Sequence, residues 1–246
     1  MGKGLIGWRR RNWSILFLAV LIGGCSARKP GDTPQPGFNM YSPQQDVELG
    51  REAAAQIRRQ VDVIENQFIQ DWISRVGQRL AQFPEAGEYP YTFTAINDPS
   101  INAFALPGGP IFMHSGLIAA ADNEAQVAGV LAHEIGHVVL RHATNQASKA
   151  SLVQIPAVLA GATLGQESVL AQLGQLGLGL GVNSLLLKYS RDAERQSDAI
   201  GAQLMAKAGY NPIEMANFFE KLEAEGGGRG PEFLSSHPNP GNRVQA

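Results

Sequence analysis

Hydrophobic positions recur at helical spacing in several stretches of the chain. Over residues 68–83 apolar side chains stand three and four positions apart, which predicts a helix with this stripe in the core. An earlier helix is expected from Ser42 to about Arg59, because Ser42 followed by Pro43 and Gln45 is typical of a helix start. Further helices are expected over residues 123–139, about 183–208 and 211–225.

Three short segments rich in β-forming residues lie between the second and third of these helices. They cover residues 91–96, 103–106 and 111–114, with turns at Asp98-Pro99 and Pro107-Gly108-Gly109. His114 is expected to belong to this sheet, and we give it no metal role. The pattern predicts an α+β fold that is mainly α-helical and contains a small β-sheet.

The first residues have the composition of an export signal. Basic residues precede an apolar core over residues 13–22, which is too short to span a bilayer comfortably. Small residues then precede Cys25, the only cysteine of the chain, and this segment resembles a bacterial lipobox. We expect residues 1–24 to be a lipoprotein signal peptide and Cys25 to be lipidated. An uncleaved anchor and an ordinary secretory signal that leaves a free thiol are the alternatives.

Residues 25–41 are polar and rich in proline and glycine, which predicts a flexible tether. Ser26 stands where an aspartate usually retains a lipoprotein in the inner membrane. Its identity therefore favours the outer membrane, facing the periplasm, over the inner membrane. Residues 42–246 remain for the folded domain.

The composition is that of one soluble domain on a lipid anchor. Removal of the first 24 residues takes away four basic side chains and changes the net charge from −2 to −6. The sequence contains no basic patch with interleaved aromatic residues, so we expect no nucleic-acid partner. Attachment to the membrane is expected through the lipid rather than through basic side chains.

Residues 151–181 are rich in alanine, leucine and glycine, but polar residues and Pro156 interrupt them. No apolar run approaches the roughly 18 residues that a membrane span requires. We interpret the segment as a mobile helical lid beside a cleft, with an ordinary pair of connecting helices as the alternative.

The strongest chemical signal is His133-Glu134-Ile135-Gly136-His137, which has the HExxH pattern of zinc hydrolases. Two histidines four positions apart lie one turn apart on the same face of a helix, so both can bind one metal ion. Glu134 lies beside them, where a general base can reach a water molecule at the metal.

A third ligand must come from elsewhere in the chain. Leu140 and Ala143 occupy the positions where a metzincin has glycine and histidine, which excludes that class. His142 lies on a different helical face and is expected at the surface. Glu194 and Asp198 share one face of a second helix, so one carboxylate can bind the metal while the other accepts a hydrogen bond from a ligand imidazole.

With these two motifs, three further segments resemble the gluzincin metalloendopeptidases related to HtpX and the CAAX-prenyl endoproteases. The segments are Asn102–Gly109 with the strand after it, Asp46–Gly50, and His237-Pro238 with Arg243 six residues after the histidine. The resemblance runs from about Ser42 to the C-terminus.

The resemblance implies a zincin-type domain with one Zn²⁺ per chain and a β-sheet that borders the active-site cleft. It implies His133, His137 and Glu194 as zinc ligands. It also implies Glu134 as the general base and Asp198 as the partner of His133.

The same resemblance assigns roles outside the ligand set. Asn102 and Ala103 are expected on a strand that pairs with an extended substrate. His237 is expected to approach the zinc and hold the enzyme latent, with Arg243 near the cleft. Arg243, His237 and Tyr189 are the candidates for stabilising the oxyanion, and the sequence does not rank them.

These features predict a zinc endopeptidase that cleaves unfolded or misassembled proteins of the bacterial envelope. Two other classes stay open. The first is a lipoprotein that binds clients or assembly machinery and uses zinc chiefly for structure. The second is a zinc hydrolase that acts on a non-peptide bond, such as a cell-wall amide.

Overall fold

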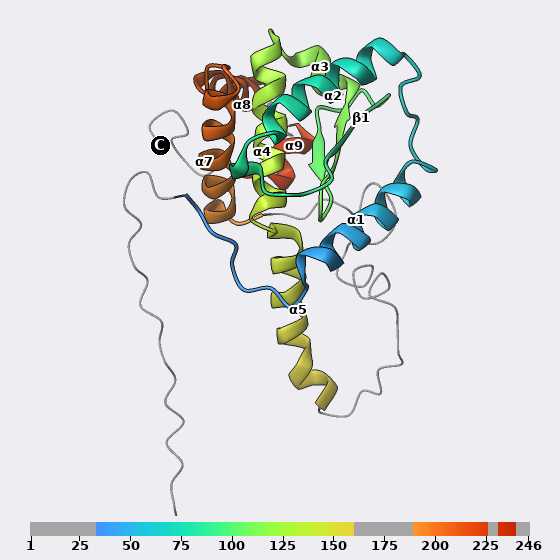
Figure 1. Ribbon diagram of the computed structural model, residues 1–246, viewed down its shortest axis with the longest axis vertical. Helices are drawn as coiled ribbons and strands as arrows, with labels where there is room; N and C mark the ends of the chain where they lie inside the picture. Colours follow the sequence, from blue (N-terminus) through green and yellow to red (C-terminus); the bar gives the residue numbers. More distant parts are fainter. Residues whose placement is uncertain (1–32, 160–188, 226–230, 240–246) are drawn as a thin grey trace, which may run out of the picture. The chain divides into compact units, whose positions relative to one another are not determined.

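The computed structural model describes residues 33–159, 189–225 and 231–239 (Figure 1). The expected signal peptide, Cys25, most of the 151–181 segment and Arg243 lie outside these residues. The described helices and strands, in chain order, are α1 (Pro43–Ile57), α2 (Gln67–Ala81), the 3-10 helix η1 (Pro84–Ala86), β1 (Thr92–Ile96), β2 (Ala103–Ala105), β3 (Pro110–His114), α3 (Ser115–Ala120), α4 (Glu124–Val139), α5 (His142–Leu159), α7 (Arg191–Lys207), α8 (Ile213–Glu225) and α9 (Glu232–Ser236).

The three expected strands form one mixed sheet in the order β1-β3-β2. β1 runs parallel to β3, with Thr92 opposite Pro110, and β2 runs antiparallel to β3, with Phe104 opposite Phe112. The rings of this last pair stack with their centroids 5.2 Å apart. The prediction of a mainly helical fold with a small sheet is confirmed.

The two N-terminal helices form as the sequence indicates. The side chain of Ser42 accepts a hydrogen bond from the Gln45 backbone, and the Gln45 side chain returns one to the Ser42 backbone, which completes a capping box. In α2 the apolar stripe is buried from Ile73 to Leu80. The expectation that the whole stripe lies in the core is wrong at Phe68, in the first turn of α2, whose exposed fraction is 72%.

Helix α4 occupies the centre of the domain, between the sheet and helices α7 and α8 (Figure 1). Its residues from Gln126 to Val138 are all buried. Glycines allow the neighbouring helices to approach closely. A Cβ added at Gly136 would lie 2.8 Å from the Cα of Ser197 in α7, and one added at Gly129 would lie 2.8 Å from the Cβ of Met215 in α8. The close approach of α4 and α7 brings the HExxH motif next to Glu194 and Asp198.

Helix α7 begins later than expected. Its first residue is Arg191, and the side chain of Ser190 caps it by accepting a hydrogen bond from the Ala193 backbone. Tyr189 therefore precedes the helix, and residues 183–188 lie outside the described part of the chain. The early start predicted for this helix overlooked Ser190, whose extended backbone and capping side chain mark the start of α7.

Helices α3 and α9, and the part of α5 before residue 151, were not expected from the sequence. Helix α5 follows α4 after a break at Leu140 and Arg141, where Arg141 has a left-handed backbone (φ 56°). It includes the beginning of the 151–181 segment, so residues 151–159 are helical. None of the helices in the described ranges combines the length and apolar character that a membrane crossing requires.

The last residues of the expected tether contact α5. The Asn39 side chain donates a hydrogen bond to the Thr144 hydroxyl (2.7 Å), and the Met40 backbone donates one to Ser148 (2.9 Å). Asn145 in turn donates to the Phe38 carbonyl. Residues 38–41 therefore lie along the first turns of α5.

Candidate metal centre

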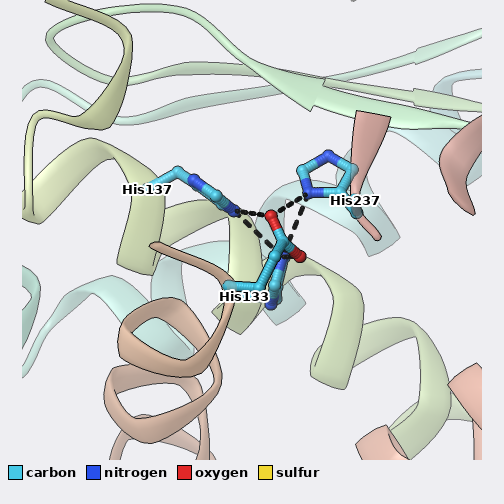
Figure 2. Close-up of side chains that lie close together, drawn as sticks. His133, His137 and His237 are labelled. Atoms are coloured by element: carbon cyan, nitrogen blue, oxygen red, sulfur yellow. Dashed lines mark hydrogen bonds and ion pairs between the residues drawn. The ribbon is translucent and has the colours of Figure 1, made fainter. Parts of the chain in front are cut away.

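Helix α4 positions the first two candidate ligands. His133 and His137 lie one turn apart, both are buried, and their Nε2 atoms are 3.0 Å apart. The helix is fixed at its start by Asn123, whose side chain accepts a hydrogen bond from the Gln126 backbone. Figure 2 shows the two imidazoles directed at a common point.

Helix α7 brings a carboxylate to the same point. Glu194 lies in its first turn and is fully buried. One carboxylate oxygen lies 3.4 Å from the Nε2 atom of His133, and the other lies 3.5 Å from that of His137. His137 and Glu194 are 57 residues apart in the sequence. Helices α4 and α7 thus bring distant residues to one site.

A third imidazole completes the group. His237 follows α9, and its Nδ1 atom lies 3.2 Å from the Nε2 atom of His133 and 3.3 Å from Glu194 (Figure 2). The ring of Phe233 stacks on the His237 ring with centroids 4.4 Å apart, and the His237 backbone donates a hydrogen bond to the Phe233 carbonyl. Both contacts hold the third imidazole over the other ligands.

The donor set and its spacing fit zinc. The four groups are His133, His137, Glu194 and His237, and one ligand atom of each lies within 4.8 Å of the others. A tetrahedral zinc with ligands at about 2.0–2.1 Å places its ligand atoms roughly 3.3 Å apart. Five of the six separations across this group, all except that between His137 and His237, run from 3.0 to 3.5 Å. Three imidazoles and one carboxylate are nitrogen and oxygen donors of the kind that zinc prefers.

Each of the two α4 imidazoles also has a partner at its Nδ1 atom, on the side opposite the proposed metal position. The Nδ1 atom of His133 lies 2.8 Å from Asp198, in the arrangement that the carboxylate pair on α7 suggested. The Nδ1 atom of His137 lies 3.0 Å from the Nδ1 atom of His142. The expectation that His142 lies at the surface is wrong, because its exposed fraction is 8%. The left-handed turn at Arg141 redirects the chain, so that the first residue of α5 covers His137.

Glu134 lies beside the group and between it and the sheet. Its carboxylate is buried, and its Oε1 atom lies 3.4 Å from the Nε2 atom of His237. Burial raises the pKa of Glu134, while the charges of His237 and His133 and a hydrogen bond from the Ala105 backbone lower it, with burial the larger effect. A carboxylate with a raised pKa can take up a proton and release it again near neutral pH.

Burial and the neighbouring carboxylates act in opposite directions on the imidazoles. Burial lowers the pKa of His133, but the hydrogen bonds and charges of Asp198 and Glu194 outweigh it and raise the pKa to about 9. Burial holds the pKa of His137 well below its usual value, and it lowers that of His142 to about 4. The pKa of Glu194 is lowered: burial opposes this, but the three neighbouring imidazoles prevail.

Strand β2 borders the site on the side of Glu134. Leu106 donates a hydrogen bond to the Pro110 carbonyl, and the Asn102 carbonyl accepts one from His114, so these two residues face β3. Because backbone groups alternate along a strand, those of Ala103 and Ala105 face the opposite edge. Asn102 and Ala103 are both buried at the start of this strand.

A small cleft opens at the other end of β2. Its lining includes Leu106, Pro107, His137, Arg141 and Tyr189. The Tyr189 ring lies over the His137 ring with centroids 4.0 Å apart. The Tyr189 backbone also donates a hydrogen bond to the Ser236 carbonyl (3.0 Å), next to His237.

The comparisons with known proteins agree with this geometry. The model of peptidase family M48 matches residues 68–246. The beta-barrel assembly-enhancing protease of Escherichia coli (strain K12) is 33% identical over 209 residues, which cover 81% of this chain and 42% of that protein. The mitochondrial metalloendopeptidase OMA1 of Schizosaccharomyces pombe is 33% identical over 176 residues, which cover 71% of this chain and 50% of that protein. The chain therefore spans half the length of these relatives or less.

Proposed function

Because the chain belongs to peptidase family M48, we propose that it is a zinc-dependent endopeptidase with the buried cluster on α4, α7 and α9 as its active site. The observation that carries this proposal is the meeting of His133, His137 and Glu194 around one point with Glu134 beside it. These three side chains are the proposed ligands of one Zn²⁺. Zinc, when bound, supplies a Lewis acid for the peptide carbonyl and lowers the pKa of water to about 7.

Glu134 is the proposed general base. Its carboxylate accepts the proton of the attacking water and then delivers that proton to the departing amine. The Ala105 backbone, at the edge of β2, lowers the pKa of this carboxylate and so favours its charged form. Asp198 holds the His133 ring through its Nδ1 atom and fixes the tautomer in which Nε2 is free to bind metal.

The substrate is proposed to bind as an added strand. The backbone groups of Ala103 and Ala105 face away from β3, and Ala105 is within hydrogen-bonding reach of Glu134. A peptide that pairs with this edge would present its carbonyl next to the general base. The segment at Asn102 and Ala103 thereby serves binding through its backbone, which suits substrates of varied sequence in an extended state.

His237 is proposed to hold the enzyme latent. Its Nδ1 atom lies where the fourth zinc ligand belongs, at 3.2 Å from His133 Nε2 and 3.3 Å from Glu194. A catalytic zinc keeps that position for water or substrate. Movement of the α9 loop, with Arg243 after it, would open the position. Once moved, His237 can join Tyr189 and Arg243 as candidates for contact with the oxyanion.

The proposed place of action is the bacterial envelope. The pattern before Cys25 supports a signal peptide over residues 1–24, a lipid anchor and a tether over residues 25–41. Ser26 supports the outer membrane, facing the periplasm. The printed name of the E. coli relative concerns β-barrel assembly, and this supports misfolded or misassembled envelope proteins as the substrates.

A client-binding or assembly lipoprotein with structural zinc is the second candidate. The observation that favours it is the closed fourth position, because structural zinc sites have four protein ligands and catalytic sites usually have three. In that case proteolysis would be minor and the cluster would chiefly stabilise the fold.

The Glu134→Gln variant separates the two candidates. We expect it to retain zinc, measured by metal analysis, and to lose cleavage of denatured casein by more than about a hundredfold, since removal of a general base typically lowers rates by 10²–10⁴. Glu220→Gln, an exposed position on α8, is the matched control and should cleave like the wild type. Full cleavage by the Glu134 variant would remove this carboxylate from the mechanism.

A further inference from the structure

We propose that His142 is a positioning residue for the metal centre, with its Nδ1 atom accepting a hydrogen bond from the Nδ1–H of the ligand His137. The inference rests on the proposed zinc site and adds a residue to it. His142 lies on α5, outside the HExxH motif, and contacts the ligand rather than the metal.

The contact between the two rings defines which nitrogen carries each proton. The two Nδ1 atoms are 3.0 Å apart, and the rings meet edge to face with an interplanar angle of 72°. A hydrogen bond of this length requires one donor and one acceptor. The Nε2 atom of His137 is directed at His133 and Glu194 (Figure 2), so its lone pair belongs to the metal. The proton of His137 is therefore on Nδ1, and His142 accepts it.

The contact of His142 with Gln196 fits the same assignment of protons. If Nδ1 of His142 accepts, its proton is on Nε2. That atom lies 3.3 Å from the carbonyl oxygen of the Gln196 side chain, which can only accept. The Ser197 hydroxyl lies 3.4 Å from the Nδ1 atom of His142 and can donate to the same lone pair. Each polar atom of the His142 ring thus has a partner of the required kind.

Helix α7 consequently supports both α4 ligands. It provides Glu194 as a ligand, Asp198 for the back of the His133 ring, and Gln196 and Ser197 for the back of His142. His142 extends this support to the Nδ1 atom of His137. Two of the three residues between Glu194 and Asp198, namely Gln196 and Ser197, therefore act on the second imidazole through His142.

The chemistry of the site favours a neutral acceptor at this place. Glu134, Glu194 and Asp198 already offer three carboxylates around one divalent ion. A fourth carboxylate behind His137 would add another negative charge to a buried site at a cost in desolvation. An imidazole orients the ligand ring and fixes its tautomer without that charge.

The backbone is built to hold His142 in place. Arg141 adopts a left-handed conformation that a residue with a side chain seldom takes. Its guanidinium donates to the buried carboxylate of Asp46 on α1 (2.6 Å) and to the Tyr41 carbonyl (2.5 Å). These contacts stabilise the turn that directs the first residue of α5 onto the ligand.

Zinc affinity of the full chain tests the proposal. Apo protein is titrated with zinc in competition with a chromophoric chelator. We expect His142→Leu, which removes the acceptor, to weaken zinc binding by about 10–100-fold, as loss of a partner behind a ligand imidazole typically does. His142→Asn can place its side-chain oxygen near the position of Nδ1 and is expected to stay within about threefold of the wild type. His114→Leu removes a buried histidine from β3 and is the matched control with unchanged affinity.

Wild-type affinity in a folded His142→Leu variant would overturn the proposal. Should that variant fail to fold, long-range ¹H–¹⁵N spectra of the zinc-loaded wild type decide: His142 with its proton on Nε2 supports the proposal, and His142 with its proton on Nδ1 overturns it. The outcome is independent of the Glu134→Gln test, because affinity and tautomer are measured without turnover. A catalytically silent protein could still show the His142 effect, and an active one could lack it.

Discussion

Gly136 of α4 lies against the backbone of Ser197 of α7, with no space for a side chain between them. A Cβ at Gly136 would stand 2.8 Å from both the Cα and the carbonyl oxygen of Ser197. Because this contact lies one residue before His137 and three residues after Glu194, it sets the distance between the two helices at the metal. The separation of the ligands is therefore defined by a glycine inside the HExxH motif.

We expect Gly136→Ala to destabilise the protein and weaken zinc binding together. Overpacking against backbone atoms destabilises by about 1–3 kcal/mol, whereas the higher helix propensity of alanine returns about 1 kcal/mol. The net loss should appear as a lower midpoint of urea unfolding and a higher zinc dissociation constant. Gly201→Ala is the graded comparison, since its Cβ would lie 3.1 Å from the His133 backbone and should disturb less. Equal zinc affinity in both variants and the wild type would show that the helix spacing does not control the site.

The parts of this site that the sequence predicts are those that depend on local spacing. The pair His133 and His137 follows from helical periodicity alone, and the sheet follows from short β-forming segments. The pair Glu194 and Asp198 also follows from helical spacing, but the choice of Glu194 as the ligand required the resemblance to known metallopeptidases, because the spacing allows either carboxylate to bind. The structure then places it within 3.5 Å of both imidazoles.

His142 could not be placed in the same way. Its position depends on the left-handed backbone of Arg141, which in turn depends on Asp46 and Tyr41 about a hundred residues earlier. The prediction extended the α4 helix through this break and therefore placed His142 at the surface. In the structure the break directs His142 inward. Tertiary contacts of this kind leave no periodic pattern, although a polar ring five residues after a ligand is a signal worth testing.

We expect His237→Ala to raise the basal peptidase activity. The imidazole lies at the fourth position of the proposed zinc site, so its removal opens that position to water and substrate. The rate should rise by the inverse of the fraction of open molecules, on the order of tenfold if one molecule in ten is open. Cleavage of a quenched peptide with zinc in excess measures this. Ser235→Ala, an exposed change on the same short helix, should leave the rate unchanged. A reduced rate with zinc retained would instead support a role for His237 on the oxyanion.

Glu124, which lies outside the proposed metal site, makes a pH-dependent contribution to the stability of the domain. Its carboxylate accepts hydrogen bonds from Trp72 of α2 and from Tyr210 after α7, each 2.8 Å long, and these lower the pKa of Glu124 from its usual 4.5. Since the pKa is lower in the folded state, the contribution is present above 4.5 and is lost as the pH falls through the folded-state value. Glu124→Gln should therefore lower the urea midpoint at neutral pH and have little effect below the folded-state pKa. An equal loss at both pH values would mean that packing, not ionisation, links these helices.

Removal of zinc should lower the stability of the whole domain. Four buried polar groups from α4, α7 and the loop after α9 converge on one point, so the ion links segments that are far apart in the sequence. For an ion that binds only the folded chain, a free concentration one thousand times the dissociation constant adds about 4 kcal/mol. Thermal unfolding with and without a chelator measures the difference, and added zinc should restore the higher midpoint. Glu194→Gln weakens one ligand and should reduce the response to the chelator, whereas Glu220→Gln on the surface of α8 should keep it. A midpoint that the chelator does not move, in a protein shown to have released its zinc, would mean that α4, α7 and α9 are held together by packing alone.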